Sequence, residues 1–205
     1  MLILARHGTT ALNEQGVVQG AQDFGLSEAG RVEAGSLARW IAGNFDIQLI
    51  FVSPARRALE TAHLVLSSLS RQAPVTVVEE LRERGYGSFE GLDADQLKAA
   101  RRQRGLGLDD LRQNWANSTE VESDAEVWSR FRHFAETAGL MNLASRMDVL
   151  AVTHGGAIKA VLCSALGIPP ERPFPFMVGP ASAAVLAVRG EYLQLYALWQ
   201  NEYSY

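Results

Sequence analysis

Met1-Leu-Ile-Leu-Ala-Arg6-His7-Gly8 opens the chain with a short apolar run that ends in polar residues. The same arrangement returns at Val149-Leu-Ala-Val-Thr153-His154-Gly155-Gly156. Short apolar runs bounded in this way are typical of buried strands in a parallel sheet. Longer helical patterns lie between the apolar runs, so the sequence predicts an α/β fold.

Six strands are expected from the apolar runs, in a mainly parallel sheet. The last two are joined by Arg189-Gly190-Glu191, a hairpin-like connection. The expected strands are Leu2–Ala5, Gln48–Val52, Val75–Val78, Asp148–Thr153, Ala183–Val188 and Tyr192–Leu198.

Helical segments separate most of these strands. The first is expected to begin at Ser27, a favourable N-cap residue, and to end near Ala42. A second should begin near Pro54, because proline is favoured in the first turn. Two more are expected, one long helix over residues 123–143 and another over 156–166. Together the elements predict a three-layer α/β/α fold with a mainly parallel central sheet.

The chain has 205 residues, of which 47% are hydrophobic and 20% charged, and this suits one domain spanning residues 1–205. Residues 84–122 have a different character, with glycines, an arginine cluster and weak periodicity. We expect this segment to be an insertion that covers the site at one end of the sheet.

Composition excludes several classes of function. The net charge of −4 argues against non-specific nucleic-acid binding, which needs a basic surface. A single cysteine, Cys163, leaves no internal disulfide and no multi-cysteine metal site. No apolar run approaches the ~20 residues of a membrane span, and Arg6 cuts the first run below the length of a signal-peptide core. We expect a cytoplasmic monomer or homodimer without nucleic-acid or membrane partners.

Polar residues suited to phosphate chemistry follow four of the expected strands almost at once. Ligands of an open parallel sheet bind beyond the carboxyl ends of its strands, so these residues are expected to meet in one pocket. They are Arg6 and His7 after the first strand, Arg57 after the second, Glu83 after the third and His154 after the fourth.

This set of side chains favours phosphoryl transfer. Two arginines and two histidines form a cationic cradle that matches a phosphoryl group. A neutral imidazole can attack phosphorus when its other ring nitrogen has an acceptor, such as a backbone carbonyl. A carboxyl group could protonate the leaving oxygen and then activate water. Because cationic side chains supply the charge stabilisation, neither a metal nor a cofactor is required.

The segment Leu4-Ala5-Arg6-His7-Gly8-Thr9-Thr10-Ala11-Leu12-Asn13, followed by Gly16 and Gln19-Gly20, resembles the signature of the histidine phosphatase superfamily. This is the phosphoglycerate mutase-like group of mutases and small phosphatases, whose fold the resemblance implies. Four further segments match the family in the same order, and they are residues 26–31, 53–62, 81–91 and 152–156. The match covers most of the chain.

The resemblance implies a role for each matched residue. His7 would carry the phosphoryl group as a phosphohistidine, and Glu83 would be the proton donor. Arg6, Arg57 and His154 would complete the phosphate pocket. The implied substrate-binding residues are Arg6, Asn13, Gln19, Gly20, Arg57 and Gly155.

Some assignments have competitors. Arg56 stands beside Arg57, and Glu79, Glu80 and Glu90 compete with Glu83. A set of aromatic residues either lines the pocket or packs between the insertion and the sheet. They are Tyr86, Phe89, Trp115, Trp128, Phe174 and Phe176.

Three functions fit the sequence. The first is a metal-independent phosphatase of a small phosphorylated metabolite, and the second a cofactor-dependent phosphoglycerate mutase. Mutases of the family usually carry longer insertions and a longer C-terminal tail, whereas this chain ends at Tyr205, soon after the last expected strand; this favours the phosphatase. A non-catalytic protein that binds phosphorylated ligands would be expected to lack His7 or Glu83, and both are present.

Overall fold

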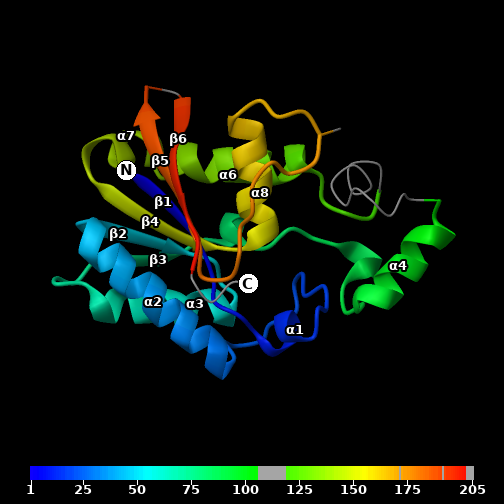
Figure 1. Ribbon diagram of the computed structural model, residues 1–205. Coiled ribbons are helices and arrows are strands. Elements are labelled where there is room, and N and C mark those ends of the chain that lie inside the picture. Colours follow the sequence, from blue (N-terminus) through cyan, green and yellow to red (C-terminus); the bar gives the residue numbers. More distant parts are fainter. Residues whose placement is uncertain (106–118, 171, 191, 202–205) are drawn as a thin grey trace.

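A computed structural model describes residues 1–105, 119–170, 172–190 and 192–201. Its six-stranded sheet has the order β3-β2-β4-β1-β5-β6 (Figure 1). The first four of these strands run parallel, while β5 and β6 are antiparallel to their neighbours. The strands are β1 Leu2–Arg6, β2 Ile47–Val52, β3 Val75–Val77, β4 Asp148–Thr153, β5 Ala183–Arg189 and β6 Tyr192–Trp199. The prediction of a mainly parallel sheet is confirmed.

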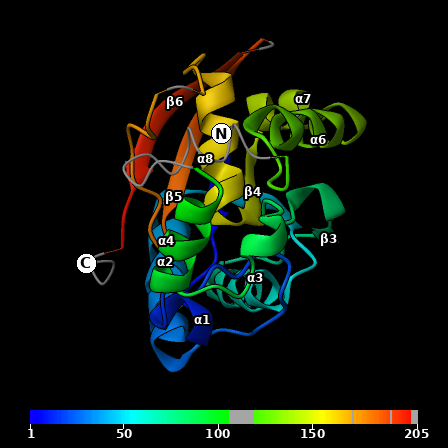
Figure 2. The same ribbon diagram turned by 90° about the vertical axis from the view of Figure 1, so that its right-hand side faces the viewer.

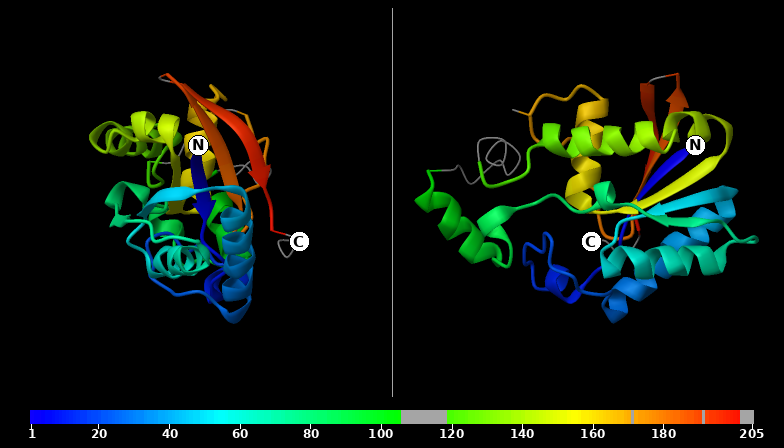
Figure 3. Two further views of the ribbon diagram at one scale, coloured as in Figure 1. Left: turned by 90° about the vertical axis from the view of Figure 1, so that its left-hand side faces the viewer. Right: turned by 180° about the vertical axis from the view of Figure 1, so that it is seen from behind.

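Helices cover both faces of the sheet (Figures 1 and 3). Alternation along β1 divides the core, because Leu2 and Leu4 face one layer while Ile3 and Ala5 face the other. Helices α6, α7 and α8 pack on the first face, and α2 and α3 on the second. The α-helices are α1 Ala11–Glu14, α2 Glu28–Asn44, α3 Arg56–Ser68, α4 Ala94–Gln103, α6 Asp124–Thr137, α7 Leu140–Arg146 and α8 Gly155–Ala165. The three-layer α/β/α prediction is also confirmed.

Two helix predictions need correction. The single helix expected over 123–143 is wrong, since α6 ends at Thr137 and α7 begins at Leu140. Gly139 between them has φ +60°, a left-handed conformation that interrupts an α-helix. The helix expected to begin near Pro54 begins at Arg56, because Ala55 is the extended N-cap residue.

The segment after β3 crosses the carboxyl edge of the sheet. It contains two 3₁₀ turns, Glu79–Leu81 and Gly87–Phe89, and then α4. Tyr86, Phe89 and Val121 form a small apolar cluster apart from the two main cores. Helix α4 lies beyond the same end of the sheet as α1 (Figures 1 and 2). The insertion expected over 84–122 includes residues 106–118, which lie outside the described residues, and the single-domain assignment stays a prediction.

The turn after β1 packs backbone to backbone on α2. A Cβ atom built on Gly8 would lie 2.3 Å from the carbonyl oxygen of Gly30, and one on Gly30 would lie 1.9 Å from that of Thr9. The Thr9 N–H also donates to the buried carboxylate of Glu33 at 2.8 Å. Glycine at both positions therefore permits the close approach that fixes the chain next to His7.

Among the described residues, no helix combines the length and apolar character needed to cross a membrane.

Candidate active site

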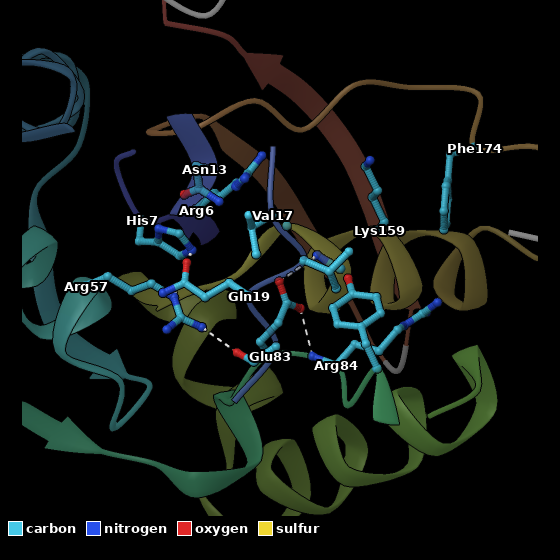
Figure 4. Close-up of a pocket in the computed structure, with 15 residues that line it drawn as sticks. Arg6, His7, Asn13, Val17, Gln19, Arg57, Glu83, Arg84, Lys159 and Phe174 are labelled. Atoms are coloured by element: carbon cyan, nitrogen blue, oxygen red, sulfur yellow. Dashed lines mark hydrogen bonds between the residues drawn. The ribbon is translucent and has the colours of Figure 1, made fainter. Parts of the chain in front are cut away.

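A cavity of about 200 Å³ opens at the carboxyl ends of β1 and β4 (Figure 4). The strands bring residues to it that are far apart in the sequence, because their carboxyl ends share one edge of the sheet. The cavity is lined by Arg6, His7, Asn13, Val17, Val18, Gln19, Gly20, Arg57, Glu83, Arg84, Tyr86, Gly155, Gly156, Lys159 and Phe174. His154, under the cavity, stacks edge-on against His7 with 5.0 Å between ring centroids.

His7 is held in one tautomer. Its Nδ1 lies 2.7 Å from the carbonyl oxygen of Gly8, so Nδ1 carries the proton and donates it. The Nε2 atom is left with a lone pair, which accepts a hydrogen bond from Arg57 Nε at 3.2 Å. Burial, with the charges of Arg6 and Arg57, lowers the pKa of His7 well below its ordinary value. The imidazole is therefore neutral at neutral pH, the state a nucleophile needs.

His154 has the opposite tautomer. Its Nε2 lies 2.7 Å from the Ser53 hydroxyl oxygen, and its Nδ1 accepts from Arg57 Nε at 3.2 Å. Ser53 is fully buried at the end of β2. Burial and the neighbouring His7, Arg57 and Arg6 lower the pKa of His154 well below its ordinary value. One guanidinium N–H thus faces both imidazoles.

Arg57 is the arginine that reaches the cavity. Its Nη1 and Nη2 donate to the carbonyl oxygens of Gln22 at 2.8 Å and Gly20 at 2.9 Å, which fixes the guanidinium beside His7. Its competitor Arg56 is exposed and pairs with Glu60 at 2.7 Å on the surface. Burial lowers the pKa of Arg57, against the opposing charges of Glu83 and Asp23. At any ordinary pH Arg57 stays cationic.

Arg6 supplies the second guanidinium. Its Nη1 donates to the carbonyl oxygen of Val178 at 2.7 Å. Its Nε is buried and has no hydrogen-bond partner within the described part of the chain. A Cβ atom on Gly155 would lie 3.1 Å from this Nε, so glycine leaves the space open. A buried donor beside the cavity is what an anionic ligand can satisfy.

Glu83 is held by the first turn of α8. Its Oε1 accepts from the backbone N–H groups of Arg84 at 2.7 Å and Ala157 at 2.9 Å, and its Oε2 accepts from Gly156 at 3.2 Å. Its competitors do not reach the cavity, since Glu79 and Glu80 are in a 3₁₀ turn and Glu90 accepts from Tyr86 and Ala21. The structure therefore places Glu83, among these four, in the cavity with His7.

The other expected substrate-binding residues also line the cavity. Asn13 caps α1 by accepting from the Thr10 N–H at 3.1 Å. Gln19 is buried and accepts from the Thr10 hydroxyl at 2.9 Å. Gly20 has φ +53° and presents its carbonyl oxygen to Arg57. Gly155 is the first residue of α8. Their contacts with a substrate stay predictions.

Ser53 and Lys159 belong to the site but are not among the residues predicted from the sequence. Lys159 lies one helical turn beyond Gly155 and Gly156, and that spacing alone could have placed it on the cavity face of α8. Of the aromatic set, Tyr86 and Phe174 line the cavity, whereas Trp128 and Phe176 pack against a main core and Phe89 joins the small cluster. Trp115 lies outside the described residues.

No group of three or more histidine, cysteine, aspartate or glutamate side chains suited to a metal occurs within the described ranges. The donors at the cavity are instead guanidinium and ammonium groups and backbone N–H groups, which bind anions.

Known proteins resemble this chain over nearly its full length. A protein of Hydrogenobacter thermophilus named "Putative phosphoserine phosphatase 2" is 30% identical over 196 residues, 93% of this chain and 90% of its own. A 2,3-bisphosphoglycerate-dependent phosphoglycerate mutase of Brucella melitensis is 25% identical over 182 residues, 83% of this chain and 84% of its own. The solved mycobacterial glucosyl-3-phosphoglycerate phosphatase superposes with a TM-score of 0.80, at 26% identity and 98% coverage of both chains.

The model of one family, the histidine phosphatase superfamily (branch 1), matches residues 2–201. This match spans both strand ends that carry the histidines and the intervening acid. The chain belongs to the histidine phosphatase superfamily.

Proposed function

We propose that the protein is a phosphomonoester hydrolase that works without a metal, through a phosphohistidine at His7. The observation that carries the proposal is the His7 Nε2 lone pair, which points to Arg57 in a cavity shared with Arg6 and Glu83. Relatives named as phosphatases support it. The substrate class is a small phosphorylated metabolite, in keeping with a cavity of about 200 Å³. Cytoplasmic location, and a monomeric or homodimeric state, stay predictions from the sequence.

The first step is attack on the substrate. His7 Nε2 forms a bond to phosphorus while the bond from phosphorus to the leaving oxygen breaks, and the Glu83 carboxyl group gives that oxygen a proton. Arg6 and Arg57 stabilise the charge on the other phosphoryl oxygens. The His7 Nδ1–H bond to the Gly8 carbonyl stabilises the charge that develops on the ring.

The second step releases phosphate. Glu83, now a carboxylate, takes a proton from a water molecule, whose oxygen attacks phosphorus as the bond to His7 Nε2 breaks. Glu83 recovers its proton, His7 returns to its neutral state and inorganic phosphate leaves. The three backbone N–H groups that hold Glu83 keep its carboxyl group in place for both steps.

A phosphoglycerate mutase is the second candidate, because relatives with that name are 25% identical over 83% of the chain. A mutase would return the phosphoryl group to a bound monophosphate and keep water from the phosphohistidine. Both activities use the same catalytic groups, so a product analysis has to separate them.

The test is phosphorus NMR of the purified protein with 3-phosphoglycerate, a trace of 2,3-bisphosphoglycerate and a chelator. Release of inorganic phosphate supports the hydrolase. Growth of the 2-phosphoglycerate signal without inorganic phosphate would instead make the protein a mutase. If neither product forms, p-nitrophenyl phosphate serves as a second substrate, and failure to hydrolyse it as well would refute the proposal.

A further inference from the structure

Lys159 lies in the cavity, at the end away from His7. It is on α8, and in Figure 4 it stands with Phe174 across the cavity from His7 and Arg57. Its Nζ lies 5.2 Å from the centroid of the Phe174 ring. A cation over an aromatic ring is attracted to the ring's face, so Phe174 holds the ammonium group in position.

Among the described residues, no carboxylate forms an ion pair with the Lys159 ammonium group. Within the described ranges, Lys159 makes no hydrogen bond and no ion pair, and its ammonium group contacts the ring of Phe174. Glu83 is the one carboxylate among the described residues that line the cavity, and its two oxygens already accept three backbone N–H groups. Burial and the nearby charge of Arg6 lower the pKa of Lys159, against the opposing charge of Glu83. A bound anion would offset both effects.

At the end of the cavity near His7, Arg6 and Arg57 already serve to bind the phosphoryl group. Arg6 and Arg57 flank His7 and supply two positive charges, which match the charge of a phosphoryl dianion bound there. Lys159 is therefore a further cation, placed where the rest of a phosphorylated substrate would extend. A phosphomonoester with a neutral remainder would leave this charge without a partner in a partly buried site.

We propose that Lys159, positioned by Phe174, binds a second anionic group of the substrate, so that the cavity selects phosphomonoesters that also carry a carboxylate or a second phosphate. The inference rests on the proposed function, since it concerns the remainder of the molecule that is dephosphorylated. It makes Lys159 a specificity-determining residue, while bond cleavage stays with His7 and Glu83.

The test compares kcat/KM for three substrates that share a three-carbon phosphate. They are 3-phosphoglycerate with a carboxylate, propane-1,3-diol bisphosphate with a second phosphate, and glycerol 3-phosphate with a neutral remainder. Wild type should favour one of the two anionic substrates over glycerol 3-phosphate. Lys159→Met should reduce this preference about tenfold or more, mainly through KM, because an ion-paired hydrogen bond is lost. The anionic substrate whose kcat/KM falls toward that of glycerol 3-phosphate in Lys159→Met identifies the anion that Lys159 binds.

Controls separate charge from packing. Lys159→Arg should retain much of the preference, and Lys159→Gln should repeat the effect of Lys159→Met with a polar side chain. Lys98→Met removes the only other lysine of the chain, which is 58% exposed and pairs with Asp95 on α4, and should change nothing. An unaltered preference in both neutral variants, or an equal loss for all three substrates, would overturn the proposal.

The outcome is distinct from failure of the proposed function. p-Nitrophenyl phosphate, which lacks a second anionic group, reports hydrolysis irrespective of Lys159. If wild type hydrolyses none of the four compounds, the proposed function fails and the inference with it. If wild type hydrolyses them without preferring an anionic substrate, the inference alone fails.

Discussion

His7 and Glu83 line the same cavity, but the chain positions them by different means. His7 follows a buried strand, and the backbone contact between Gly8 and Gly30 holds its turn directly against α2. Glu83 belongs to the irregular segment after β3, where no strand or helix fixes the backbone. Side chains and the N-terminus of α8 do this work instead.

Glu122 is one of the side chains that fix the Glu83 segment. Its backbone N–H donates to the Gly85 carbonyl at 2.8 Å, and its carboxylate accepts from the Gly85 N–H at 3.1 Å. Arg130 on α6 donates to the same carboxylate at 2.8 Å and also to the Glu80 carbonyl oxygen. The nucleophile thus depends on backbone packing, whereas the acid depends on a polar network that single substitutions can weaken by degrees.

The largest effect on activity is expected at His7, directly after β1. His7→Ala removes the atom that accepts the phosphoryl group, so turnover of every substrate should fall by at least about 10³-fold while the fold survives. Steady-state phosphate release measures the turnover, and thermal unfolding shows whether the fold survives. The matched control is His63→Ala, an exposed histidine on α3, which should behave as wild type. Activity retained in His7→Ala would remove the nucleophile from the mechanism.

Glu83→Gln should separate substrates by leaving group. It retains the size of the side chain but cannot give a proton, so kcat/KM, which reports attack on the substrate, should fall about 10²- to 10⁴-fold for an alkyl phosphate. p-Nitrophenyl phosphate should lose much less, because its leaving oxygen needs no proton. Equal losses in kcat/KM on the two substrates, measured side by side, would mean that Glu83 binds the phosphoryl group rather than protonating the leaving oxygen.

Ser53→Ala should have an intermediate effect. It removes the acceptor for the His154 Nε2–H, so the tautomer that places a lone pair on Nδ1 keeps the support of Arg57 but is less strongly favoured. Loss of a buried hydrogen bond predicts a decrease of about tenfold in kcat/KM for all substrates. Nitrogen NMR of the His154 ring should show a mixture of tautomers. Ser67→Ala, at an exposed serine of α3, is the control, and an unchanged nitrogen spectrum in Ser53→Ala would contradict the assignment.

Glu122→Gln should give the smallest effect, with the same leaving-group signature as Glu83→Gln. Alkyl phosphates should lose a few-fold in kcat/KM and p-nitrophenyl phosphate less, because the Glu83 segment is less firmly held. An equal loss of kcat/KM on both substrates would mean that Glu122 does not act through Glu83. The control is Glu136→Gln, whose partner Arg132 is on the surface.

The same variant should change stability in a pH-dependent way. Burial by itself would raise the pKa of Glu122, but the hydrogen bond and charge of Arg130, the Gly85 N–H and Arg82 outweigh it and leave the pKa below its ordinary value. Stability from such a group is present above the unfolded pKa of about 4.3 and is lost as the pH falls through the lower folded value. Urea unfolding should show wild type about 1–2 kcal/mol more stable than Glu122→Gln at pH 7, and less so below about pH 4. A constant difference would contradict this account.

The site residues that directly follow β1 and β4 can be predicted from local sequence patterns. Buried strands that end at Arg6, His7 and His154 predict that these residues meet, through the geometry of parallel sheets alone, and the structure brings them together. Ser53 was part of the same pattern, but nothing in its neighbours indicates that its hydroxyl, rather than a backbone group, would meet His154.

Other features depend on information that periodicity does not carry. Apolar residues continue on both sides of Gly139, so the break between α6 and α7 is visible only in the left-handed backbone of that residue. The sequence around Lys159 does not distinguish it from a solvent-exposed helix residue. Its contact with the ring of Phe174, fifteen residues further along the chain, is visible only in the structure. The contact of Glu122 with Gly85 likewise joins segments that no local pattern relates.

The contact between Gly8 and Gly30 also bears on how such an enzyme can be redirected. With a carbonyl oxygen 2.3 Å from any Cβ at position 8, the turn at His7 has no room for a new side chain, and a replacement there displaces the nucleophile itself. We therefore expect mutagenesis libraries of this turn to yield inactive variants rather than variants with new substrates. At the other end of the cavity, Lys159 contacts Phe174 in the loop between α8 and β5, and we expect substitutions there to change substrate choice more than the chemical steps.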